Sequence, residues 1–139
     1  RYIFVLIDSL TRWVELVPWK IRTCKEVIAA LLSICCRIGI ISTLVTDNGT
    51  IFTSALANQI YSYLGIEIRH SLPYHPEANA LAERVIGTVK KGLHHIIHSS
   101  GSDARRWHER LPLLCFAYRS IPHSTTGLSP ARMVYGRDV

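Results

Sequence analysis

Hydrophobic residues along the chain gather in short continuous runs, which are typical of buried β-strands. Residues 1–8 form one such run and residues 40–46 form another. Residues 13–18 and 66–70 predict two further strands, and the short turn before the first of these predicts a hairpin with the opening strand. The pattern itself therefore predicts four strands.

Apolar residues spaced three and four apart predict helices between and after these strands. Thr23, with Glu26 three residues later, has the spacing of a helix-capping box, and Gly39 and Gly65 stand where helix C-termini are expected. The predicted helices cover about residues 23–37, a stretch that begins at Thr53 or Ser54 and ends at about Leu64, and residues 78–99 and 103–120. Strands and helices in this order, with one β-α-β crossover, predict an α/β layered domain.

The length of the chain, 139 residues, fits one compact domain. We expect that domain to cover residues 1–121, and the turn-rich residues 122–139 to form a C-terminal extension, the start of a linker to a further domain. The chain opens inside a strand without a Met, which predicts a fragment of a longer protein. Residues 27–45 are nearly apolar, but Arg37 at their centre is costly in a bilayer, so we expect no membrane segment.

The charge and the cysteine content of the chain indicate what kind of partner it binds and in which cellular compartment it is expected. The 16 Lys and Arg residues outnumber the 10 Asp and Glu residues, and the net charge of +6 favours a polyanionic partner. The four cysteines include no Cys-x-x-Cys pair, which argues against a disulfide framework and a zinc ribbon. We therefore expect reduced thiols in an intracellular protein.

Three acidic residues stand where a carboxylate is costly or exposed. Asp8 and Asp47 each follow an apolar strand, and if these strands are parallel neighbours, both carboxylates emerge at the same edge of the sheet. Glu83 lies in the first turns of the helix predicted at residues 78–99, on the face opposite its apolar residues. Each residue also has a simpler interpretation, since Asp47 precedes Asn-Gly, a common turn, and an acid near a helix N-terminus is favoured by the helix dipole.

Carboxylates that converge repel one another unless a cation neutralises them. Oxygen ligands without nearby His or Cys suit Mg²⁺, for which Mn²⁺ can substitute. Two such ions about 3.5–4 Å apart activate an attacking oxygen and stabilise a leaving one at a phosphodiester. The residues thus predict a two-metal site for phosphoryl chemistry.

Four segments resemble retroviral and retrotransposon integrase cores. Residues 5–18, VLIDSLTRWVELVP, resemble the first strand pair of that family, and residues 46–52, TDNGTIF, resemble its second-Asp motif. Residues 75–84, HPEANALAER, are similar to the loop and helix that carry its Glu, and 35 residues (48–82) separate this Glu from the second Asp. Residues 117–136 resemble the Gypsy-class elements in particular.

This resemblance implies a ribonuclease H-like α/β fold, with a central mixed five-stranded sheet flanked by helices. It implies an enzyme that trims the 3′ ends of element DNA with water and then transfers the strand into target DNA. Asp8, Asp47 and Glu83 are then the catalytic residues and the ligands of two Mg²⁺ ions. The expected partners are double-stranded DNA, both element ends and target, and further copies of the chain in a dimer or higher oligomer. We expect the protein to be intracellular, and nuclear when it acts on host DNA.

The resemblance also suggests DNA contacts around the carboxylates. Lys90 lies seven residues after Glu83, at the position where the family is expected to hold a DNA end. Arg84 either contacts phosphate or pairs with a neighbouring acid, and Tyr74 and Asn79 flank the loop, where they receive a base or a sugar or serve as plain loop residues.

Two other readings of the sequence stay open beside the enzyme. A domesticated integrase-like module would bind DNA or protein without catalysis, and it would be expected to have lost one of the three carboxylates. A cellular ribonuclease H shares the fold and the ions, but its Glu is not expected this late in the chain. The presence of all three carboxylates favours the integrase.

Overall fold

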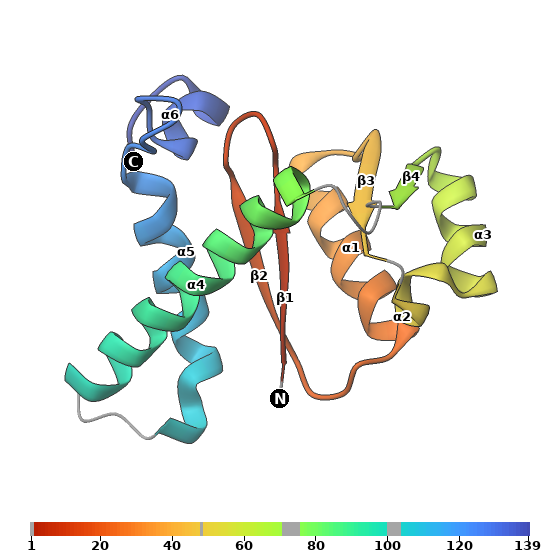
Figure 1. Cartoon of the computed structure of the whole chain (residues 1–139), viewed down its shortest axis with the longest axis horizontal. Helices are drawn as coiled ribbons and strands as arrows, with labels where there is room; N and C mark the ends of the chain where they lie inside the picture. The colour runs from red at the N-terminus through yellow and green to blue at the C-terminus, as the bar shows by residue number, and fades with distance from the viewer. Residues whose placement is uncertain (1, 48, 71–75, 100–103) are drawn as a thin grey trace. The chain divides into compact units, whose positions relative to one another are not determined.

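The structure is a computed structural model, and it describes residues 2–47, 49–70, 76–99 and 104–139. Its elements, in chain order, are β1 (Tyr2–Ile7), β2 (Val14–Trp19), α1 (Cys24–Ile38), β3 (Thr43–Thr46), α2 (Thr50–Thr53), α3 (Ala55–Leu64), β4 (Glu67–His70), α4 (Pro76–Ser99), the 3-10 helix η1 (Ala104–Arg110), α5 (Leu111–Ser120) and α6 (Pro130–Tyr135) (Figure 1). Contacts group the chain into two compact units. The first unit comprises residues 1–4 and 19–80, and the second comprises residues 5–18 and 81–139.

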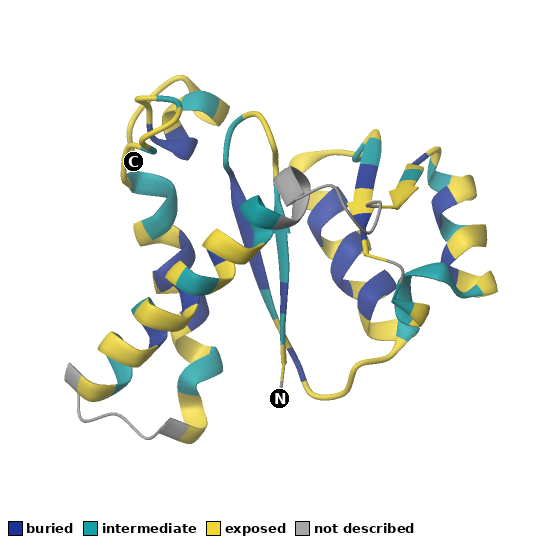
Figure 2. Cartoon of the chain, viewed as in Figure 1, coloured by how far each residue is buried: buried dark blue, intermediate teal, exposed yellow. Residues whose placement is uncertain are grey.

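The first unit is built around α1. Thr23 caps this helix, because its side chain accepts a hydrogen bond from the Glu26 N–H, and Gly39 ends it with a positive φ of 97°. One face of α1 carries fully buried residues such as Leu31 and Ile34, while the opposite face is exposed (Figure 2). The helix contacts α2 and α3, and α3 contacts β4. This packing supports β3, which pairs with β4 in parallel from Thr43 opposite Glu67 to Thr46 opposite His70.

The second unit joins residues 5–18 of the β1–β2 hairpin to helices from the C-terminal half of the chain. On α4, the buried residues Val85, Val89 and Leu93 follow one another at a spacing of four and form one apolar seam. An alanine Cβ at Gly92 would lie only 2.5 Å from Leu114 Cδ1, so α4 and α5 approach closely at this point. α5 in turn contacts η1 and α6.

The described residues do not form the expected five-stranded mixed sheet. They form two sheets of two strands each, β1 with β2 and β3 with β4, so β1 and β3 are not hydrogen-bonded neighbours. The apolar pattern itself predicted only four strands, and beyond β4 the described chain is helical or in turns, which leaves no fifth segment to pair. The strands β3 and β4, of four residues each, offer few groups for a wider ladder.

Two helical predictions also need correction. The helix predicted at residues 103–120 consists of η1 followed by α5, with non-helical backbone at Arg106 and a Pro in the first turn of α5. The tail at residues 122–139, predicted to be turn-rich, contains α6, which Ser129 caps and Gly136 ends. The division of the chain at residue 121 stays a prediction. Among the described residues, no helix is both long enough and apolar enough to cross a membrane.

Candidate active site

Asp8 follows β1 in a turn that fixes one of its carboxylate oxygens. The Asp8 N–H donates to the Trp13 carbonyl at 2.9 Å, and the Arg12 N–H donates to the Asp8 carbonyl at 3.0 Å. The Thr11 N–H and hydroxyl both donate to Asp8 Oδ2, at 2.7 and 2.6 Å. Oδ1 has no hydrogen-bond partner among the described residues. The exposed Asp8 side chain is therefore oriented through Oδ2, and its Oδ1 remains available to bind a cation.

A buried ion pair holds the hairpin behind Asp8. Arg119 Nη2 lies 2.9 Å from Glu15 Oε1, which also accepts from Trp13 Nε1–H at 2.9 Å. The Arg119 guanidinium donates to the Val14 carbonyl at 3.0 and 2.6 Å and lies 3.9 Å from the centroid of the Trp13 ring. Trp13 packs edge-on against Tyr135 of α6, with centroids 5.4 Å apart. These contacts join β2 to α5 and α6 and so fix the strand that pairs with β1.

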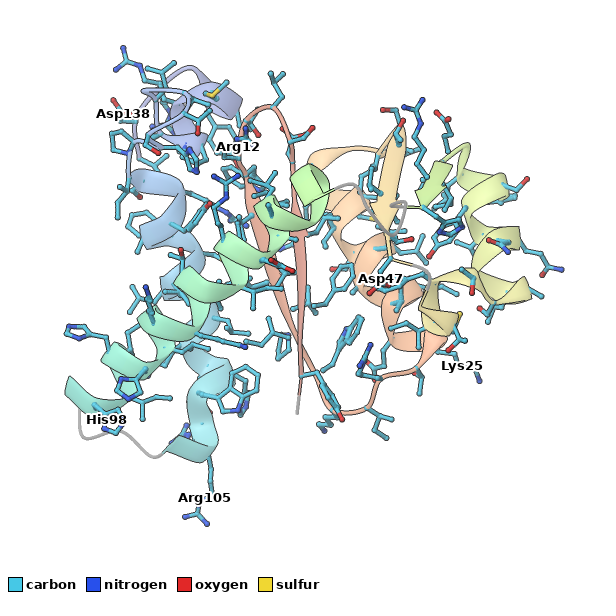
Figure 3. The ribbon with its side chains drawn as sticks, in the orientation of Figure 1. Arg12, Lys25, Asp47, His98, Arg105 and Asp138 are labelled. Atoms are coloured by element: carbon cyan, nitrogen blue, oxygen red, sulfur yellow. The ribbon has the colours of Figure 1, made fainter. Side chains whose placement is uncertain are left out.

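Asp47 follows β3, and its carboxylate is held by a hydrogen bond from a residue in the same turn. The Gly49 N–H donates to Asp47 Oδ1 at 3.1 Å, and within the described part of the chain Oδ2 has no partner. An alanine Cβ at Gly49 would lie 2.9 Å from Asp47 Oδ1, so the carboxylate needs a glycine at that position to keep this orientation. Asp47 is exposed and, like Asp8, offers one uncommitted oxygen (Figure 3).

Glu83 stands on α4 and is exposed, two residues before the buried seam begins at Val85. Two residues correspond to about 200° of helix rotation, so Glu83 and Val85 lie on opposite faces. Glu83 has no hydrogen bond or ion pair with any residue that the structure describes. The packing of α4 therefore presents this carboxylate to solvent.

The candidate DNA contacts fall partly outside the described residues. Tyr74 is not described, and neither is the side chain of Asn79. Lys90 is exposed on α4, and Arg84 is exposed beside Glu83, with its carbonyl accepting from the Thr88 hydroxyl at 3.0 Å. Both basic residues thus lie on the exposed surface of the helix that carries Glu83, and their DNA contacts stay predictions.

A family model described as "Integrase core domain" matches residues 1–76, which is more than half of the chain. The chain belongs to the integrase core domain family. The match includes Asp8 and Asp47, while Glu83 lies beyond it. The integrase core identified from the motifs is thereby confirmed.

Curated relatives of this integrase core are retroviral polyproteins. The chain is 34% identical over 137 residues to the Pol polyprotein of Radiation murine leukemia virus (strain Kaplan), a match that covers 98% of this chain and 23% of that protein. It is 33% identical over 137 residues to the Gag-Pol polyprotein of Feline leukemia virus, with 98% and 8% covered. The chain thus spans less than a quarter of these relatives. The Gypsy-class likeness of the tail stays a prediction.

Solved structures similar to this integrase core show its fold. One is a chain of the simian T-cell lymphotropic virus intasome in complex with PP2A regulatory subunit B56 gamma (TM-score 0.84, 21% identity, 96% of this chain and 48% of that chain covered). Another is the catalytic core domain of BIV integrase (TM-score 0.80, 22% identity, 96% and 85% covered). A third is the HTLV-2 integrase catalytic core domain in complex with magnesium, in a trimeric form (TM-score 0.77, 18% identity, 96% and 84% covered). The expected ribonuclease H-like fold is confirmed.

The donor set of this integrase core fits a hard divalent cation. Asp8, Asp47 and Glu83 supply only oxygen, the ligand atom that Mg²⁺ prefers, and all three are exposed, with oxygens that no described residue engages. Asp8 and Glu83 belong to the second unit and Asp47 to the first. Within the described ranges, no three His, Cys, Asp or Glu side chains converge in a group that would hold a metal ion. The chemistry of the predicted ligands fits, and their convergence stays a prediction.

Two residues that sequence reasoning passed over, Tyr118 and His123, are affected electrostatically by Arg12 and Arg84. Burial, and then the positive charges of Arg12 and Arg84, lower the pKa of His123 below its usual value of 6.5. Burial raises the pKa of the Tyr118 phenol, and the same two arginines act against that rise. Tyr118 and His123 lie far along the chain from Arg12, so no spacing in the sequence marks this electrostatic effect.

Proposed function

We propose that this integrase core catalyses polynucleotidyl transfer on DNA. In this proposal it trims the 3′ ends of element DNA with water and then joins the freed 3′ hydroxyl to a target phosphodiester. The supporting observation is the state of the three carboxylates, which are exposed and retain oxygens that no described residue engages. An exposed carboxylate with an unengaged oxygen can bind a cation without first giving up a hydrogen bond or an ion pair within the protein.

Asp8, Asp47 and Glu83 would be the ligands of two Mg²⁺ ions. When bound, such ions supply a Lewis acid that activates the attacking oxygen and stabilises the leaving one. The protein itself contributes orientation. Thr11 holds Asp8 Oδ2 and Gly49 holds Asp47 Oδ1, so neither side chain has to be ordered at the moment of reaction.

The partners follow from this chemistry. Double-stranded DNA, both element ends and target, would be the substrate. Joining two element ends to the target requires at least two copies of the chain, which agrees with the intasome and trimeric forms of the similar structures. Lys90, Arg84, Asn79 and Tyr74 would contact the DNA, for which a net charge of +6 is favourable. Work on host DNA would place the protein in the nucleus.

A strand-transfer assay on a labelled oligonucleotide duplex with Mg²⁺ or Mn²⁺ tests the proposal. We expect the wild-type chain to join strands and Glu83→Gln to lose at least about a hundredfold in rate, because a neutral amide is a poor ligand for a hard cation. Glu26→Gln is the matched control, since Glu26 is also an exposed glutamate near a helix N-terminus, and it should retain full activity.

Two results would contradict the proposal. Equal activity of wild type and Glu83→Gln would show that Glu83 is not a ligand. Inactivity of the wild type, together with DNA binding that does not depend on Mg²⁺, would favour a non-catalytic integrase-like module instead.

A further inference from the structure

Two histidine side chains lie against each other near the C-terminal end of α4. The ring centroids of His94 and His98 are 4.1 Å apart, and the planes of the two rings are tilted by 42°. The residues are four positions apart on one helix, so their side chains project from the same face. Both are exposed, and Figure 3 shows His98 at the end of the helix.

Neither ring is engaged elsewhere in the protein. Within the part of the chain that the structure describes, His94 and His98 make no hydrogen bond and no ion pair. The packing of α4 depends on the buried seam of Val85, Val89 and Leu93, which lies on a different face of the helix. The ring nitrogens of both histidines are therefore available to bind a ligand.

The arrangement of the two rings fits a transition-metal ion. Neutral imidazole nitrogen is a preferred ligand of Zn²⁺, Cu²⁺ and Ni²⁺, and two histidines four positions apart on a helix can bind one zinc ion together. Because a Zn–N bond is about 2.0–2.1 Å long, two nitrogens on one tetrahedral ion are roughly 3.3 Å apart. Rings with centroids 4.1 Å apart can reach this separation by rotation of the side chains alone, without a change in the helix backbone.

The charges around the pair indicate which ions it selects. The carbonyl end of a helix favours positive charge, and His98 lies in the last turn of α4. Lys90 and Lys91, about one turn before His94, are exposed and repel a cation. A hard ion such as Mg²⁺, which prefers oxygen ligands, gains nothing from imidazole to offset this repulsion. The pair therefore selects an ion by the type of donor atom and not by a general attraction for cations.

We propose that His94 and His98 form a binding site for one transition-metal ion of the zinc type, with water in the remaining coordination positions. Among the described residues, no third His, Cys, Asp or Glu side chain joins the pair, so the ion keeps open positions. Glu83 lies eleven residues before His94, about 16 Å away along the helix axis, so the site is separate from this proposed Mg²⁺ ligand. A bound ion links two turns of α4 and stabilises the end of the helix.

Calorimetric titration with Zn²⁺ tests the site. The reference is the full chain with Cys36→Ser, because Cys36 is exposed and its thiol can itself bind zinc, and excess Mg²⁺ is present to occupy the carboxylates. At mildly alkaline pH, we expect His94→Asn and His98→Asn each to bind zinc at least about tenfold more weakly, because a single imidazole loses the advantage of two linked ligands.

His95→Asn is the matched control for these variants. It removes an exposed histidine from the adjacent position, which is turned by about 100° around the helix axis from His94. This variant should bind zinc as tightly as the reference chain. All three substitutions are at exposed positions, so each variant should fold, which thermal unfolding without zinc verifies.

Two further measurements locate the ion. Nuclear magnetic resonance should show the ring signals of His94 and His98 shifting together as zinc is added, while those of His95 stay in place. Zinc should also raise the thermal unfolding midpoint of the reference chain, because it binds the folded state, and should raise that of His94→Asn less.

The possible outcomes decide the proposal without reference to strand transfer. Equal zinc affinity in the reference chain and in His94→Asn would overturn the site, and an equal loss in His95→Asn would overturn the assignment of the pair. Zinc-dependent shifts confined to one ring would show binding by a single histidine and would also overturn it. Failure of the proposed function would leave each of these results unchanged.

Discussion

Two Arg–Glu ion pairs, one in each unit of the molecule, have nearly the same length and very different surroundings. Arg119 and Glu15 in the second unit are 2.9 Å apart, with side chains that are 19% and 6% exposed. Arg69 and Glu67 in the first unit are also 2.9 Å apart, with side chains that are 65% and 57% exposed. The Arg119–Glu15 pair connects β2 to α5, whereas the Arg69–Glu67 pair connects two residues of the same strand, β4.

The difference shows how the two strand-end aspartates are held. Asp8 lies on a hairpin that a buried network of Arg119, Glu15 and Trp13 fixes to distant helices. Asp47 depends on a short parallel ladder and on one hydrogen bond from Gly49. The same type of proposed metal ligand therefore relies on tertiary packing in one unit and on local turn chemistry in the other.

Removal of the buried pair should give the largest effect. Arg119→Met keeps the length of the side chain but removes the positive charge beside the buried Glu15 carboxylate, and we expect the free energy of unfolding to fall by about 3 kcal/mol. Arg69→Met, the equivalent change in the exposed pair, should have no measurable effect. Urea denaturation of both variants measures the contrast. Equal losses in the two would show that burial does not distinguish these pairs.

A change at the turn of each aspartate should affect activity more than stability. Gly49→Ala places a Cβ 2.9 Å from Asp47 Oδ1 and must displace the carboxylate, so we expect strand transfer to fall roughly tenfold or more. Thr11→Val removes the hydroxyl donor to Asp8 Oδ2 but keeps the N–H donor at 2.7 Å, so its loss should be smaller. Strand-transfer rates for the two variants decide the order, and the reverse order would contradict the local anchoring of Asp47.

The smallest expected effect is a change in how the free energy of unfolding depends on pH, and it concerns His123 in the second unit. The pKa of His123 is lowered in the folded protein, so as pH falls below about 6.5 the unfolded chain takes up a proton that the folded chain resists. The free energy of unfolding should therefore decrease as pH falls through this range, and His123→Asn should weaken that dependence. Thermal unfolding as a function of pH measures it, with the exposed His95 replaced by Asn as the control. An unchanged dependence in His123→Asn would show that other groups cause it.

Much of the fold is predictable where the signal is local. The cap at Thr23, the start of a helix at about residue 54 and its end at Gly65 are confirmed, because each depends on one side chain or one backbone angle. α6 carried the same kind of signal, with Ser129 as its cap, Pro130 in its first turn and a left-handed Gly136, and it was missed. The number of strands in a sheet depends on pairing between distant segments, and for that reason the five-stranded prediction was wrong for the described residues.

The candidate site, like the fold, is predictable from the sequence only where the signal is local. Asp8 and Asp47 are recognisable as candidates because each follows an apolar strand, although Asp47 also has the interpretation of a turn residue, and Glu83 because it lies opposite an apolar seam. The electrostatic effect of Arg12 on the pKa of His123 has no such signal, since more than a hundred residues separate them in the sequence. Only the packing of the second unit brings these groups together.

The seam of α4 has a consequence for how related sequences are compared. Val85, Val89 and Leu93 fix the rotation of the helix, and Glu83 is exposed only because it lies two residues before the first of them. Insertion of a single residue between Glu83 and Val85 would turn the carboxylate by about 100° around the helix axis. Exposed positions of this helix tolerate substitution, whereas an insertion or deletion would change which face carries Glu83. In an alignment of integrase cores, gaps therefore belong outside residues 83–93.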